Sequence, residues 1–119
     1  MPRVTRLTIA AAAAFAVAVP AQAQAAPTLL NATVGPGFTI TLKTAAGKQV
    51  KTLKPGTYRI AVNDLSGMHN FALRGPGVAK ATSVPWTGST TWAVKLKKGT
   101  YTFVCDPHAS TMRGTFKVK

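Results

Sequence analysis

A chain of 119 residues has the size of one small domain with a single core, and it is too short for two. Its only cysteine, Cys105, excludes a disulfide within the chain. A formal net charge of +13, with Asp64 and Asp106 as the only acids, makes the chain strongly basic and favours acidic partners.

The N-terminal 23 residues differ in composition from the rest. Residues 1–6 include two arginines, residues 7–19 are an alanine-rich apolar run, and Ala21-Gln22-Ala23 is a small-residue pattern. This order is typical of a secretory signal peptide cleaved after Ala23, or after Ala25 in the overlapping pattern. A transmembrane anchor is the alternative, but the run is shorter than the roughly 20 residues that span a bilayer. We therefore predict a periplasmic or extracellular protein whose residues 24–119 form one domain without a membrane-spanning segment.

The charge of that domain points to a class of partner. Removing Arg3 and Arg6 lowers the formal net charge from +13 to +11. Such an imbalance favours an acidic redox protein or an anionic surface. Nucleic acid is not expected, because the basic residues are spread along the strands rather than gathered with aromatic residues. A basic surface that only maintains solubility is the alternative to a binding role. We also expect the protein to be a monomer.

From Thr28 onward the sequence predicts β-strands. Apolar and polar residues alternate in short runs separated by Gly and Pro, and no window shows a helical period. With the runs Leu29–Val34 and His69–Leu73 there are about seven to eight strands, which predict an all-β, antiparallel Greek-key sandwich of two sheets. The side chains expected to face the interior are Phe38, Ile40, Leu42, Tyr58, Ile60, Val62, Trp92, Val94, Leu96, Tyr101, Phe103, Cys105, Phe116 and Val118, whereas Thr102 and Val104 are expected to face outward.

The same alternation predicts where two potential ligands point. His69 shares its phase with Phe71 and Leu73, and Cys105 shares its phase with Phe103. Both side chains are therefore expected between the sheets, each at a strand end beside a loop. An imidazole and a thiol placed in this way meet if their strands are neighbours.

A third and a fourth donor follow Cys105 in the spacing Cys-x2-His-x3-Met, which brings in His108 and Met112. Two imidazoles, one thiolate and one weak thioether suit copper that cycles between Cu(I) and Cu(II), whereas zinc sites more often take four strong ligands. Taken singly, Cys105 could be a buried core thiol, either histidine could be satisfied in another way, and Met112 could be core filler. Together with His69 they predict a site for one copper ion.

At these residues the chain resembles the cupredoxins, the type 1 blue copper proteins of the plastocyanin and azurin kind. The resemblance rests on the segments Met68–Phe71 and Tyr101–Phe116. It implies His69, Cys105 and His108 as equatorial ligands and Met112 as the long axial ligand. It also implies that Asn70 ties the two ligand-bearing loops together and hydrogen-bonds near the thiolate.

Two further expectations come from the same resemblance. The ring edge of His108 would lie at the surface among Pro36, Pro107 and Ala109 and serve as the port for electrons. Asp106 departs from the Ser or Thr often found after the cysteine. Its carboxylate would lower the reduction potential, and the nearby Arg113 would act in the opposite direction.

The predicted function is electron transfer between redox partners outside the cytoplasm, and not catalysis. One copper site, two carboxylates in all and no second histidine cluster leave nothing to bind and activate a substrate. Two alternatives stay open on the sequence. One is a protein that stores or delivers Cu(I), and the other is a metal-free basic β-sandwich that binds acidic polymers.

Overall fold

The computed structural model of the chain describes residue 2, residues 9–18 and residues 26–119. The cleavage sites predicted after Ala23 and Ala25 lie outside these residues. Residues 9–18 have no regular secondary structure, and their side chains are exposed. Among the residues described, no helix has the length and apolar character needed to cross a membrane.

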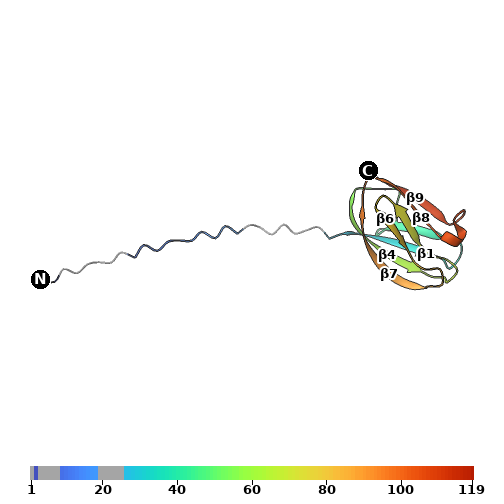
Figure 1. Cartoon of the computed structure of the whole chain (residues 1–119), viewed down its shortest axis with the longest axis horizontal. Helices are drawn as coiled ribbons and strands as arrows, with labels where there is room; N and C mark the ends of the chain where they lie inside the picture. Colours follow the sequence, from blue (N-terminus) through green and yellow to red (C-terminus); the bar gives the residue numbers. More distant parts are fainter. Residues whose placement is uncertain (1, 3–8, 19–25) are drawn as a thin grey trace.

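Residues 28–118 form two sheets packed face to face (Figure 1). One sheet has the strand order β2-β1-β4-β7, and the other has the order β3-β9-β8-β5-β6. A 3-10 helix, η1 (Asp106–His108), joins β8 to β9. The strands are β1 (Thr28–Val34), β2 (Ile40–Thr44), β3 (Thr52–Leu53), β4 (Gly56–Asp64), β5 (Ala72–Gly75), β6 (Val78–Ala81), β7 (Gly88–Leu96), β8 (Gly99–Val104) and β9 (Arg113–Val118).

The predicted all-β sandwich of two sheets is confirmed, with two differences in detail. The sheets are mixed, because β1 pairs with β4 and β3 pairs with β9 in parallel. The short strands β3 and β6 were not predicted. The first has two residues, and the second leaves all its side chains exposed or half-buried, so neither shows the alternation that marks a strand.

The interior matches the alternation of the long strands. Tyr58, Ile60 and Val62 of β4 are buried, as are Phe116 and Val118 of β9. Each sheet contributes one apolar face, and burial of these faces is the main source of stability of the fold.

Two residues differ from the predicted pattern. Phe38 is 66% exposed, because it precedes β2 in a turn and the strand alternation does not extend to it. Val104 was expected to face outward but is buried. Val104 lies in β8, which has a paired strand on each side. It is opposite Ala72 of β5 and Arg113 of β9.

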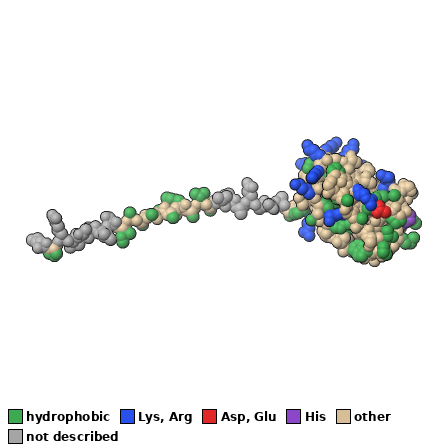
Figure 2. All heavy atoms as spheres, viewed as in Figure 1, with side chains coloured by type: hydrophobic (Ala, Val, Ile, Leu, Met, Phe, Trp, Pro, Cys, Tyr) green, Lys and Arg blue, Asp and Glu red, His purple; other side chains and the backbone are tan. Residues whose placement is uncertain are grey.

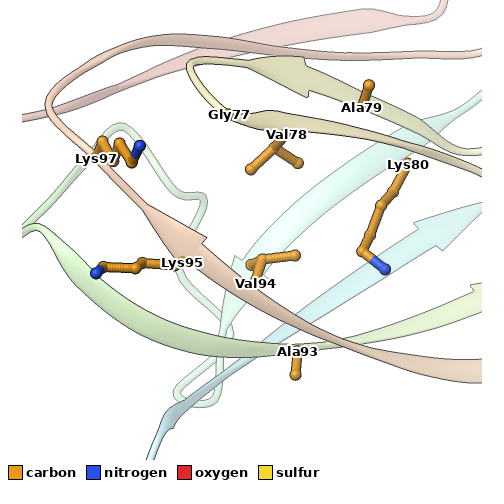
Figure 3. A pocket seen from close by; sticks show the side chains of 8 residues that line it. All are labelled: Gly77, Val78, Ala79, Lys80, Ala93, Val94, Lys95 and Lys97. Atoms are coloured by element: carbon orange, nitrogen blue, oxygen red, sulfur yellow. The ribbon is translucent and has the colours of Figure 1, made fainter.

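The two ends of the sandwich differ in what they carry. At one end, β1, β4 and β8 finish and their loops converge, so Asp64 and Cys105 lie there. At the other end β1 begins at Thr28 and β9 finishes at Val118 (Figure 1). Between the ends, the edge strands β6 and β7 border a groove of about 360 Å³ that is lined by Val78 and Val94 together with three lysines (Figure 3).

Candidate metal centre

His69 lies in the loop between β4 and β5, and not in a strand as predicted, because β5 begins only at Ala72. Local hydrogen bonds shape this loop. Ser66 N donates to Asp64 Oδ1 at 3.1 Å, Met68 N donates to Ser66 Oγ at 3.2 Å, and His69 N donates to Ser66 O at 3.2 Å. The imidazole is 1% exposed. The loop turn, rather than strand phase, therefore aims His69 into the molecule.

Cys105 and His108 lie on one short loop that is closed by its own backbone. Cys105 follows β8 and is fully buried. Its N–H donates to Met112 O at 2.9 Å, and its carbonyl accepts from His108 N at 3.0 Å. Pro107 lies at the start of η1, where its fixed φ suits a helical turn and its missing N–H costs nothing. The loop therefore presents the thiol and the imidazole from a rigid frame.

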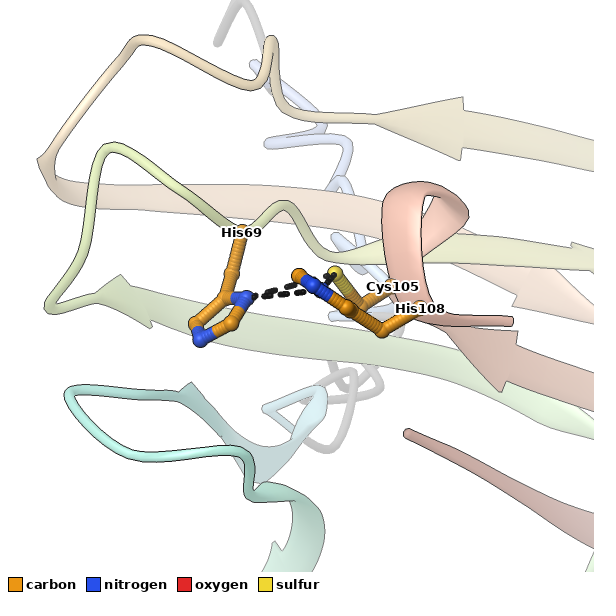
Figure 4. Close-up of side chains that lie close together, drawn as sticks. All are labelled: His69, Cys105 and His108. Atoms are coloured by element: carbon orange, nitrogen blue, oxygen red, sulfur yellow. Dashed lines mark hydrogen bonds between the residues drawn. The ribbon is translucent and has the colours of Figure 1, made fainter. Parts of the chain in front are cut away.

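Three donor atoms from these two loops point at one another (Figure 4). Cys105 Sγ lies 3.7 Å from His69 Nδ1 and 3.6 Å from His108 Nδ1. The two Nδ1 atoms are 3.1 Å apart. Donors that share one ion through bonds of about 2.0–2.3 Å must lie about 3–4 Å apart, and these three do. The set of one thiolate and two imidazoles fits a type 1 copper site.

Met112, the fourth predicted ligand, is 1% exposed and belongs to the hydrophobic core. Its N–H donates to His108 O at 2.8 Å, so its backbone is part of the loop that carries two of the donors. Met68, the other methionine near the site in sequence, is 64% exposed. The axial role of Met112 stays a prediction.

Asn70 connects the two loops that carry the donors. Its Oδ1 accepts from Asp106 N at 2.7 Å, and its Nδ2 donates to Asp106 Oδ2 at 2.9 Å. The same Nδ2 also donates to the carbonyl of Thr82 at 3.1 Å. Because Asn70 is only 3% exposed, its own amide group is shielded from water. The hydrogen bonds hold the residue after His69 against the residue after Cys105.

An ion pair at this end involves Arg74, which the sequence analysis missed. Arg74 of β5 forms two hydrogen bonds with Asp106, at 2.9 and 3.2 Å. These bonds, together with the one from Asn70, hold the pKa of the Asp106 carboxyl below its usual value. Arg113 is nearer to Asp106 in sequence. Arg74 becomes the partner because β5 lies beside β8, a pairing that local sequence does not reveal.

Phe38 covers both imidazoles, although it was predicted to lie in the core. Its ring makes edge contacts with His69 and His108, with centroid distances of 5.3 and 5.0 Å. Leu65 and Met68, also large and exposed, lie in the loop between β4 and β5 at the same end. Among the three donor residues, His69 and Cys105 are buried and His108 is half-buried. The ring of His108 therefore has the most contact with solvent.

Gly35 controls the space beside His69, and we predict a large effect of Gly35→Ala. The residue has φ +75°, and an added Cβ would lie 3.0 Å from Ser66 Cβ and 3.4 Å from His69 Cδ2. Backbone strain and this crowding together should lower the free energy of unfolding by about 2 kcal/mol and weaken metal binding. Urea unfolding and a metal titration measure the two effects.

Gly37→Ala is the matched control, because it alters the other glycine beside the same proline. An added Cβ there meets nothing within 4 Å, and the residue is not in the left-handed region. Equal losses in the two variants would contradict the role assigned to Gly35.

Comparison with known proteins agrees with this geometry. Residues 31–119 match the sequence profile of the copper binding proteins of the plastocyanin/azurin family. A search of curated proteins finds no significant match.

Several solved structures have a similar fold. Rusticyanin from Thiobacillus ferrooxidans is 28% identical, with a TM-score of 0.50 and 76% of each chain covered. A methionine-to-glutamine variant of rusticyanin is 23% identical, with a TM-score of 0.58 and the same coverage. Dithionite-reduced auracyanin from the photosynthetic bacterium Roseiflexus castenholzii is 19% identical, with a TM-score of 0.54, and the match covers 80% of this chain and 99% of auracyanin. The last two likenesses concern the fold alone.

Proposed function

Because the chain belongs to the plastocyanin/azurin family of copper-binding proteins, we propose that it is a type 1 blue copper protein that carries single electrons between partners outside the cytoplasm. The observation that carries the proposal is the convergence of His69 Nδ1, His108 Nδ1 and Cys105 Sγ within 4.8 Å of one another. These three side chains would hold the copper, with Met112 as axial ligand. When bound, the copper supplies the Cu(II)/Cu(I) couple.

The protein contributes a frame that changes little when the charge of the site changes. Cys105 and His69 are buried, and the loop of Cys105 is closed by backbone hydrogen bonds. Asn70 joins that loop to the loop of His69. Donors held in this way need little rearrangement between two oxidation states, and a small rearrangement favours fast electron transfer.

The exposed end of the site supports an electron port at His108. Its ring is half-buried and lies beneath the exposed Phe38, while Pro36, Pro107 and Ala109 are exposed in the neighbouring loops. An apolar surface of this kind can exclude water from a contact with a redox partner. We propose that electrons enter and leave through this edge and that the protein has no catalytic activity of its own.

The remaining parts of the proposal concern processing and location. We propose that residues 1–23 are removed as a signal peptide during export, with cleavage after Ala25 as the alternative. The functional unit is then a monomeric domain in the periplasm or outside the cell. N-terminal sequencing of the exported protein tests this part independently of copper.

The decisive experiment for the proposed function is a titration of the purified protein with Cu(II), followed in the visible range. We expect an intense thiolate-to-copper band that saturates at one equivalent. Voltammetry of the loaded protein should then show one reversible one-electron wave. A saturating band without a reversible wave would favour storage or delivery of copper, and a solution that stays colourless would contradict the proposal.

Phe38 is expected to tune the reduction potential. In Phe38→Ala, water reaches the two imidazole rings that the phenyl ring covers. Water stabilises the oxidised site, which carries one more positive charge, so the potential should fall. A fall of about 40 mV would correspond to about 1 kcal/mol for a one-electron couple. Voltammetry measures this shift directly.

Leu65→Ala is the control for Phe38→Ala. It also removes an exposed apolar side chain from this end, in the loop between β4 and β5. Its potential should match that of the wild type. An unchanged potential in Phe38→Ala would show that the ring does not shield the site.

A further inference from the structure

The two acidic residues of the chain both lie at the end of the sandwich that carries the candidate metal centre. Asp64 is buried at the end of β4 and accepts a hydrogen bond from Ser66 N. Asp106, in η1, is paired with Arg74 and Asn70. Since the chain has no other Asp or Glu, no acidic side chain is left to neutralise basic residues elsewhere.

The opposite end of the sandwich is covered by lysines, and we call this surface the lysine end. Its members lie in the turns and strand termini where β2, β3, β7 and β9 finish and where β4 and β8 begin, and all of them are exposed. Figure 2 shows blue side chains gathered on the part of the domain that joins the N-terminal segment, with histidine at the opposite edge. The lysine end consists of Lys48, Lys54, Lys97, Lys98, Lys117 and Lys119.

Backbone pairing brings these lysines onto one continuous surface. Lys119 N donates to Leu53 O at 3.0 Å, which brings Lys119 beside the turn that contains Lys54. Lys117 lies opposite Thr100 in the pairing of β9 with β8, directly after the turn that contains Lys98. Segments far apart in sequence therefore contribute to the same patch of positive charge.

We propose that the lysine end binds an anionic lipid surface, so that the end with Phe38 and His108 faces away from it. This orientation deepens the proposed function, because a site held away from the surface stays free for a redox partner. Clusters of four to eight basic residues are typical of proteins that bind anionic lipids. Near such a surface each lysine strengthens binding roughly fivefold.

The composition of the lysine end favours lipid over an acidic protein. Protein interfaces are enriched in aromatic residues and arginine and depleted of lysine. The arginines of the domain, Arg59, Arg74 and Arg113, lie within strands rather than in the turns of the lysine end, and the exposed Phe38 is at the opposite end. A surface of mobile lysines suits a diffuse field of phosphate groups better than a shaped partner.

The position of the N-terminal segment favours the same orientation. The chain enters the domain at Thr28, which lies at the lysine end (Figure 1). The described residues 9–18 of the preceding segment are apolar and exposed. Before cleavage, the apolar segment is therefore attached to the domain at its lysine end.

The test measures binding of the full chain to sedimentable vesicles. One set contains equal parts of phosphatidylglycerol and phosphatidylcholine, and the other contains phosphatidylcholine alone. The ratio of the two affinities removes the contribution of the apolar segment, which both sets share. We expect a ratio above about a hundred at low salt that falls towards one at high salt.

Two double variants that remove the same number of charges distinguish binding through a local surface from binding through the net charge of the protein. Lys54→Gln with Lys98→Gln alters the lysine end, and this pair should lower the ratio more than tenfold. Lys51→Gln with Lys80→Gln alters the sides of the sandwich and should lower it less than threefold. Lys51 borders a hollow with Arg113, and Lys80 borders the groove of Figure 3. Near-ultraviolet circular dichroism confirms that both variants are folded.

Three results would overturn the proposal. Equal losses in the two double variants would show that net charge or the groove, and not the lysine end, governs binding. A wild-type ratio near one would exclude anionic lipid. Retention on an acidic polypeptide matrix without vesicle binding would assign the lysine end to an acidic protein. None of these measurements needs copper, so they are independent of the colour and voltammetry that decide the proposed function.

Discussion

Cys105→Ser should abolish the intense visible absorption of the copper-loaded protein while the fold persists. The band arises from charge transfer between a thiolate and copper, and Cys105 is the only thiol of the chain. A hydroxyl is a poor ligand for Cu(I), so binding of the reduced metal should also weaken. The measurements are a visible spectrum at saturating Cu(II) and a competition titration with a Cu(I) chelator.

The variant should remain folded, because the substitution only replaces the sulfur atom with a smaller oxygen atom. Cys105 is fully buried, and placing a hydroxyl there should cost about 1–2 kcal/mol. Domains of this kind have about 5–15 kcal/mol of stability, so the metal-free variant should unfold cooperatively. Met112→Leu is the control, because it alters the same loop but keeps the thiolate and therefore a charge-transfer band. A band that survives in Cys105→Ser would remove the basis of the proposed site.

Asn70→Ala should be the most destabilising exchange of a polar residue near the site. It removes both hydrogen bonds to Asp106 and the bond to the Thr82 carbonyl, all near a side chain that is 3% exposed. Backbone groups of Asp106 and Thr82 would lose their partner in a place that water reaches poorly. We expect the free energy of unfolding of the metal-free protein to fall by about 3 kcal/mol. Urea unfolding measures the change.

Asn63→Ala is the matched control for Asn70→Ala. Asn63 is exposed on β4, and its Oδ1 accepts a hydrogen bond from Ser89 at the surface. Its loss should cost less than about 0.5 kcal/mol. Asn70→Ala should in addition weaken copper binding, because the two loops are no longer held together, whereas Asn63→Ala should not. Similar values for the two variants would mean that the bonds of Asn70 are not what joins the loops.

Local patterns in the sequence were enough for the long strands. In β4 and β9 every second residue is apolar, and the structure buries those residues. Such a pattern depends only on the alternation of side chains along one strand, which needs no knowledge of neighbouring strands. Alternation gave a wrong prediction for Phe38, which precedes the strand. It gave no prediction for β6, because that strand has no buried side chain.

The candidate site shows the same division between local and distant contributions. Cys105, His108 and Met112 lie on one loop, so their proximity follows from spacing alone. The inward direction of His69 was predicted correctly, but from strand alternation. In the structure this direction comes from the hydrogen-bonded turn at Ser66. The role of Asn70 as a link between loops was implied by family resemblance and could not be derived from residue spacing.

The sequence by itself determined the all-β class, the interior faces of the long strands and the proximity of Cys105 and His108, because each depends on residues close together in the chain. Tertiary structure alone decided which distant residues meet. The parallel pairing of β1 with β4, the pairing of Arg74 with Asp106 and the contact of Phe38 with two imidazoles depend on which strands and loops are neighbours. The lysine end arises in the same way, because strand pairing gathers lysines from separate turns onto one surface.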